Sequence, residues 1–132
     1  MSVRVRLPLN PMPAPRPRVT SRGWAYFPKR YKQWREDAAA LIPGLLTECG
    51  LKAPLDGALG ISVDFAVAQP KTTKLLFPKG DIDNFLKILD CFNGLLWEDD
   101  YQIINVEAAK RWAPKGRPGH VDILVKNLGR WR

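Results

Sequence analysis

The sequence predicts one domain of the α/β or α+β class, with a small mixed β-sheet, two main helices and the element order β-α-β-α-β-β. Apolar and polar residues alternate, as in half-buried strands, near residues 3–7, 61–67, 104–109 and 121–125. Apolar residues recur at helical spacing in residues 31–49 and 85–92. A chain of 132 residues is long enough for one domain and too short for two ordinary ones.

The boundaries of these elements follow from prolines and glycines. Prolines between residues 8 and 17 end the first strand and predict a basic, Pro-rich arm over residues 8–30. Gly50 ends the first helix, and Pro43 predicts a kink or a break within it. A turn over residues 115–119 predicts that the third and fourth strands pair as a hairpin.

The ends of the chain and its cysteines complete these expectations. The basic tail, residues 127–132, is expected to be disordered, and His120 is expected to lie at the surface. Cys49 and Cys91 suit small buried hydrophobic residues better than a disulfide framework. The first residues lack the apolar core of a signal peptide, and no segment approaches the length of a membrane span. We therefore expect a cytoplasmic protein with no membrane partner.

Charge is divided unevenly along the chain. The formal net charge is +8, and the first 35 residues hold nine Lys or Arg and no acid. Residues 80–102 hold six of the 13 acidic residues: Asp81, Asp83, Asp90, Glu98, Asp99 and Asp100. Basic segments around an acidic centre favour a polyanionic partner, gripped through its backbone while chemistry occurs in the middle.

The acidic stretch predicts a divalent cation site. Carboxylates that repel one another on a basic background are most simply explained by a cation between them, and oxygen ligands select Mg²⁺ or Mn²⁺ over zinc. If the chain is extended at Ile82, Asp81 and Asp83 share one side. Lys87 lies four residues after Asp83, so it can face the same site. The alternative is that Asp83 caps the helix and that residues 98–100 form an ordinary solvated turn.

The same residues carry a family resemblance. The spaced pattern D-I-D-N-x-x-K-x-x-x-D, followed by W-x-D-D-x-Q, resembles the signature of RusA-like endodeoxyribonucleases, the Holliday junction resolvases of bacteria and their phages. The resemblance implies that Asp81, Asp83 and Asp100 are catalytic metal ligands and that Lys87 is an essential basic partner. It also implies a homodimer that nicks four-way DNA junctions symmetrically with Mg²⁺ or Mn²⁺. Spacing alone leaves open whether Asp99 or Asp100 is the principal ligand.

Other residues have supporting or DNA-binding roles in this hypothesis. Asp90 is expected to face the site or to orient Lys87, whereas Asn84 and Gln102 are expected to be hydrogen-bonding supports. Trp24, Tyr26 and Phe27 either stack on bases or pack into the core, and at least one is expected to pack. Two basic segments, the arm and a loop at residues 69–80, are expected to contact DNA through Arg16, Arg18, Arg22, Lys29, Arg30, Lys71, Lys74 and Lys79.

Two other functions remain open from the sequence. One is a non-catalytic, basic DNA-binding protein, which would bind in a salt-sensitive manner without cleavage. The other is a metal-dependent nuclease for other branched DNA, such as flaps or forks. The junction endonuclease, a phosphodiester hydrolase acting in DNA recombination and repair, is favoured because the acidic residues and Lys87 occur together at the family's spacing.

Overall fold

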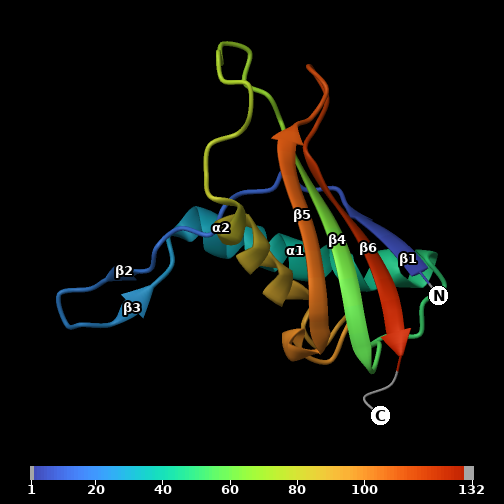
Figure 1. Cartoon of the computed structure of the whole chain (residues 1–132). Helices are drawn as coiled ribbons and strands as arrows, with labels where there is room; N and C mark the ends of the chain where they lie inside the picture. The colour runs from blue at the N-terminus through green and yellow to red at the C-terminus, as the bar shows by residue number, and fades with distance from the viewer. Residues whose placement is uncertain (1, 130–132) are drawn as a thin grey trace.

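The computed structural model describes residues 2–129, which form a mixed α+β domain (Figure 1). The elements within that range are β1 (Ser2–Leu7), β2 (Arg18–Val19), β3 (Ala25–Tyr26), α1 (Lys29–Glu48), β4 (Ala58–Val67), α2 (Ile82–Leu86), the 3-10 helices η1 (Lys87–Phe92) and η2 (Asp100–Gln102), β5 (Ile103–Trp112) and β6 (His120–Gly129). The predicted class and the predicted order of the main elements are confirmed. None of the helices in this range is both long and apolar enough to cross a bilayer.

The main sheet has the strand order β1-β6-β4-β5. β6 pairs antiparallel with β1 and with β4, and β4 pairs parallel with β5. The predicted hairpin of β5 and β6 is therefore wrong, because β4 lies between them. Burial explains this order: β4 carries Leu59, Ile61, Val63 and Phe65 into the core and takes a central place, whereas β5 is largely exposed and lies at the edge.

The segment after β5 is a crossing connection rather than a tight turn. Gly119 ends it in close contact with neighbouring chain segments: a Cβ there would lie 2.8 Å from the carbonyl oxygen of Ala66. Only glycine allows this approach. The chain can then enter β6 beside β4, on the side away from β5.

Helix α1 covers one face of the sheet (Figure 1). Its buried residues recur every three or four positions: Tyr31, Trp34, Ala38, Ile42 and Leu46. Pro43 lies inside α1, yet the helix continues to Glu48, and Ile42 and Leu46 on either side of Pro43 are buried in the core. The predicted break at Pro43 is therefore wrong. The Trp34 indole N–H donates to the carbonyl oxygen of Asn10, 2.8 Å away, which fixes the start of the Pro-rich arm against α1.

The second predicted helix is a short α-helix followed by a 3-10 helix. α2 spans Ile82–Leu86, and η1 continues over Lys87–Phe92 with Ile88, Leu89 and Phe92 buried. The helix begins right after Asp81, so Asp83 lies in its first turn. The premise that the chain is extended through Asp83 is wrong.

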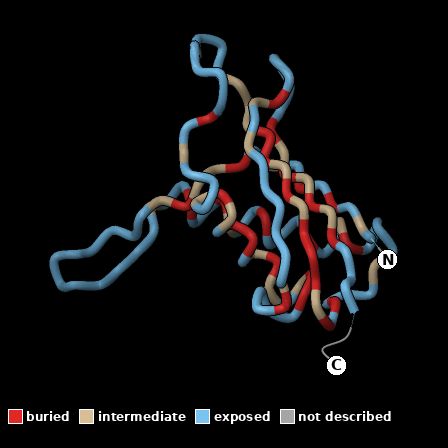
Figure 2. Tube along the Cα trace, viewed as in Figure 1, coloured by how far each residue is buried: buried red, intermediate tan, exposed pale blue. Residues whose placement is uncertain are grey.

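The remaining sequence expectations fall on the arm, the tail and the cysteines. The arm contains a two-stranded hairpin, β2 with β3, that projects from the body (Figures 1 and 2). Asn127–Gly129 belong to β6 and are not a disordered tail, and residues 130–132 lie outside the described range. Both cysteines are free, but Cys49 is exposed rather than buried. Cys91 is partly buried, and this burial raises the pKa of its thiol to about 11.

Candidate active site

A cleft of about 650 Å³ lies where the arm, α1, α2, η1 and the start of β5 meet. Five residues predicted from the sequence line it: Arg16, Asn84, Lys87, Asp90 and Asp100. They come from the arm, from α2 and η1, and from η2. The fold therefore brings one carboxylate of the Asp99–Asp100 pair to the same cavity as Lys87, although Asp100 follows Lys87 by 13 positions in the sequence.

Asn84 determines where Lys87 points. The Lys87 Nζ donates to Asn84 Oδ1 at 3.1 Å. The backbone carbonyl of Asn84 also accepts a hydrogen bond from the Ala14 amide at 2.9 Å, which ties the arm to α2. Asn84 therefore links the arm to the ammonium group in the cleft through these two hydrogen bonds.

Asp99 and Asp100 are adjacent carboxylates whose negative charges repel one another. The neighbouring Asp99, through hydrogen bonding and charge, raises the pKa of Asp100, and partial desolvation and the charge of Asp90 add to this. A divalent cation between the two carboxylates would relieve the same repulsion. The local chemistry therefore suits a hard cation.

Gln102 holds the loop that presents these carboxylates. Its side chain is 1% exposed, and Oε1 accepts the amides of Glu98 and Asp99 at 2.8 and 2.9 Å. Its Nε2 donates to the carbonyl oxygens of Leu55 and Gly57. The Asp99 side chain in turn accepts a hydrogen bond from the backbone amide of Gln102. These reciprocal bonds between Asp99 and Gln102 form a capping box at the start of η2.

Asp90 lines the cleft but pairs with Arg35 rather than with Lys87. The Arg35 guanidinium lies 3.3 Å from Asp90 Oδ2. Arg35 also lines the cleft and was missed by the sequence reasoning. The available signal was its place one turn after Tyr31, at the border of the buried stripe of α1.

Asp81 and Asp83 are exposed at the start of α2 and do not line the cleft. Asp81 is the N-cap residue, but its carbonyl, and not its carboxylate, accepts the amides of Asn84 and Phe85. The alternative in which Asp83 caps the helix is wrong, because Asp83 lies inside the helix. Neither carboxylate makes a side-chain capping bond for α2 among the described residues.

Two residues of β5 hold the loop that leads to Asp81, and the sequence reasoning missed both. Lys110 Nζ donates to the carbonyl oxygen of Pro78 at 2.8 Å and to that of Gly80, and it lies over the Phe77 ring. The Trp112 indole donates to the carbonyl oxygen of Leu75 at 2.9 Å. The alternation of β5 places both on the side of the strand toward α2, but nothing in the sequence indicates that their partners are backbone carbonyls.

The predicted DNA-binding residues lie on two projecting segments, the β2–β3 hairpin with its flanks and the loop at residues 69–80 (Figure 2). Both segments leave the body close to α2 (Figure 1). Their basic side chains are exposed: Arg16, Arg18, Arg22, Lys29, Arg30, Lys71, Lys74 and Lys79. Phe27 packs its ring 5.3 Å from that of Tyr31, whereas Trp24 stays exposed.

The spacing of acidic residues, the cleft and the basic segments agree with one comparison with known proteins. A family model described as endodeoxyribonuclease RusA matches residues 8–125. The chain belongs to the RusA endodeoxyribonuclease family. A search of curated proteins found no match to the chain.

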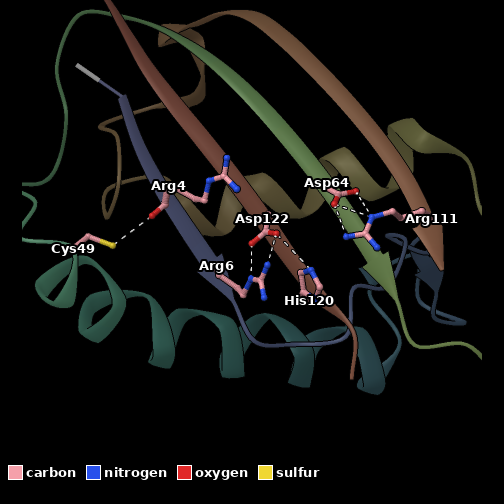
Figure 3. Close-up of polar contacts among 7 residues, drawn as sticks. All are labelled: Arg4, Arg6, Cys49, Asp64, Arg111, His120 and Asp122. Carbon is pink, nitrogen blue, oxygen red and sulfur yellow. Dashed lines mark hydrogen bonds and ion pairs between the residues drawn. The ribbon is translucent and has the colours of Figure 1, made fainter. Parts of the chain in front are cut away.

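A second acidic group competes with the RusA-type site on geometry alone. Within residues 2–129, the three-residue group whose ligand atoms all lie within 4.8 Å is Asp64, His120 and Asp122 (Figure 3). These residues alternate with core residues of β4 and β6, so they lie on the sheet face away from α1. His120 is only 14% exposed there, so the expected plain surface role is wrong.

Arginines already neutralise that group. Arg6 Nε lies 2.7 Å from Asp122, and Arg111 Nη2 lies 2.9 Å from Asp64. Burial alone would raise the pKa of Asp122, but the hydrogen bond and charge of Arg6, with His120 and Arg4 nearby, hold that pKa below its ordinary value. The group is an ion-pair ladder across the sheet.

Proposed function

We propose that this RusA-family chain is a divalent-metal-dependent endodeoxyribonuclease that resolves four-way DNA junctions by paired, symmetric nicks. The observation that carries the proposal is the cleft, where Asp100, beside Asp99, shares one cavity with Lys87 and Arg16. The cleft opens beside the basic arm, which carries no acidic residue. This charge distribution suits a DNA backbone held at the flanks and cut at an acidic centre.

The residues have distinct roles in the proposed reaction. Asp100 and Asp99 would hold Mg²⁺ or Mn²⁺, and Asp81 and Asp83, which lie at the start of α2 outside the cleft, would have to approach the ion to complete its ligand set. The ion would supply an activated water and neutralise the phosphate charge. Lys87, oriented by Asn84, donates to an oxygen of the scissile phosphate and stabilises the charge that develops there.

The Asp99–Asp100 pair links proton and metal binding. Because Asp99 raises the pKa of Asp100, protons compete with a cation for the Asp100 carboxylate at a higher pH than for an ordinary Asp. Arg35 forms an ion pair with Asp90, which also lines the cleft. This ion pair lowers the net negative charge of the cleft when no cation is bound.

Paired nicking requires two active sites. We propose a homodimer, whose two-fold axis matches the pseudo-two-fold symmetry of a four-way junction. The cytoplasm, where bacterial or phage DNA recombines and is repaired, is the proposed place of action.

Cleavage of a labelled synthetic four-way junction and a matched linear duplex tests the proposal. We expect symmetric nicks in the junction alone with Mg²⁺, none with EDTA, and at least an about hundredfold slower rate for Asp83→Asn with binding retained. Asp37→Asn is the control, because Asp37 is exposed on α1 and bonded to Gln33. Binding without cleavage in Mg²⁺ or Mn²⁺ would identify a DNA-binding protein instead, and equal cleavage of flaps or forks would identify a broader nuclease.

A further inference from the structure

The tip of the β2–β3 hairpin is a built turn that presents one tryptophan. The Thr20 amide donates to the carbonyl oxygen of Trp24, and the Gly23 amide donates to that of Thr20, both at 2.9 Å. The Trp24 amide also donates to the Thr20 hydroxyl at 3.1 Å. Gly23 has φ +84°, which closes the turn at little steric cost. The position of Trp24 is therefore fixed by backbone hydrogen bonds.

Trp24 has no place in the core. It is 72% exposed, and Val19 and Tyr26 on the same hairpin are also exposed. Figure 2 shows that this hairpin projects from the body and is exposed along its length. The buried cluster of the domain excludes all three. A single exposed apolar side chain needs no explanation, but three of them on one projecting two-stranded hairpin form a candidate interaction surface.

Charge indicates the chemistry of the partner. Arg16, Arg18 and Arg22 precede Trp24 in the sequence, Lys29 and Arg30 follow it, and residues 8–30 contain no acid. An ordinary protein surface would leave this charge unbalanced, whereas a nucleic acid offers phosphates to the cations and a base to the indole. An aromatic side chain can stack only on a base that has no other base stacked on one of its two faces.

The hairpin is continuous with the cleft. Arg16 and Pro17 on its outgoing side and Phe27 on its returning side line the same cavity as Lys87 and Asp100. A DNA strand whose phosphate lay in the cleft would therefore have the hairpin beside it. In an open, unstacked junction the bases at the branch point lack one stacking neighbour, whereas bases inside an intact duplex keep both.

We propose that Trp24 stacks on a base exposed at the branch point and thereby gives the protein its preference for branched DNA. This inference rests on the proposed function, because it takes the cleft as the place where the strand is cut. It adds the element that recognises the branch, which lies on the hairpin and outside the catalytic residues.

Binding measurements in EDTA, where cleavage is prevented, test the role of Trp24. The probes are a four-way junction with 2-aminopurine at the branch and a linear duplex of the same sequence. For Trp24→Ala we expect about ten- to a hundredfold weaker junction binding, less than about twofold change for the duplex, and loss of the 2-aminopurine quenching. Trp24→Phe is expected to restore most of the affinity.

A control variant and a measurement of assembly separate base stacking from a general loss of DNA affinity. Leu41→Ala removes a partly exposed apolar side chain from α1, and we expect it to leave the affinity for the junction and for the duplex unchanged. Equal weakening on junction and duplex would overturn the inference, and so would a change from dimer to monomer in Trp24→Ala, which would place the hairpin at a contact between copies. If binding is selective for the junction and depends on Trp24, but no cleavage occurs in Mg²⁺, the nuclease proposal is contradicted while the inference about Trp24 is supported.

Discussion

Single residues at the site act mainly by positioning others. Asn84 orients Lys87, Arg35 neutralises Asp90, and Lys110 anchors the loop before Asp81. Lys110 is the most informative of these, because its ammonium binds backbone carbonyls at residues 78 and 80 from a neighbouring strand. Replacing the Lys110 side chain would release the loop at residues 78–80 that leads to Asp81, and it would leave every carboxylate of the site unchanged.

Lys110→Gln is therefore expected to weaken metal binding more than it weakens DNA binding. The Mg²⁺ concentration for half-maximal junction cleavage should rise about ten- to a hundredfold, the range for residues that support metal ligands. Arg111→Gln is the matched control: it lies next in the strand, faces the other side and pairs with Asp64. An equal rise in both variants, or unchanged metal dependence in Lys110→Gln, would contradict a positioning role.

The Asp99–Asp100 pair predicts the pH dependence of cleavage. The hydrogen bond and charge of Asp99 raise the pKa of Asp100, so protons compete with the metal at a higher pH than for an ordinary Asp. Asp99→Asn removes that charge and is expected to move the acid limb of the pH–rate profile to lower pH. An unshifted acid limb would mean that Asp100 does not control it.

At the scale of elements, the Gln102 capping box connects the η2 loop to the loop before β4. Gln102→Ala leaves two buried carbonyls and two amides without their partner, and we expect it to lower the free energy of unfolding by ~2–4 kcal/mol. Urea unfolding measures this loss.

Gln33→Ala provides the comparison for Gln102, because Gln33 is exposed and makes one i, i+4 bond to Asp37. We expect it to change stability by less than ~0.5 kcal/mol. Equal losses in the two variants would contradict a special role for the buried box.

The sequence predicts some elements well for a physical reason. Tyr31, Trp34, Ala38, Ile42 and Leu46 mark the face of α1 that the core must cover, so periodicity alone finds the helix. Periodicity does not say which strand lies beside which. The placement of β4 between β5 and β6 follows from burial in the folded domain and brings Gly119 close to the Ala66 carbonyl, and both are tertiary features.

The candidate site is predictable to a similar extent. Asp81, Asp83, Lys87 and Asp100 stand out because of their spacing and their charge contrast with the rest of the chain. The contacts of Lys110 and Trp112 cannot be found this way, because their partners are carbonyls that every residue carries. The start of α2 was misplaced because Asp83, a favoured capping residue, also suits the first turn of a helix.

At the scale of the whole molecule, the basic hairpin and the loop at residues 69–80 flank an acidic site on a sheet with one helical layer. In the proposed function, this arrangement provides one active site, which would hold one DNA strand. Two copies are needed to cut both strands of a junction before it dissociates, so we predict coupled nicks from a homodimer.

The most direct test uses a supercoiled plasmid that extrudes a cruciform. With Mg²⁺, two nicks within one binding event convert it to a linear molecule, and this is the predicted main product. Asp100→Asn should leave the plasmid supercoiled while still binding the cruciform. Nicked circles as the lasting main product would contradict paired resolution, and an uncut plasmid with wild-type protein in both Mg²⁺ and Mn²⁺ would contradict the enzymatic account.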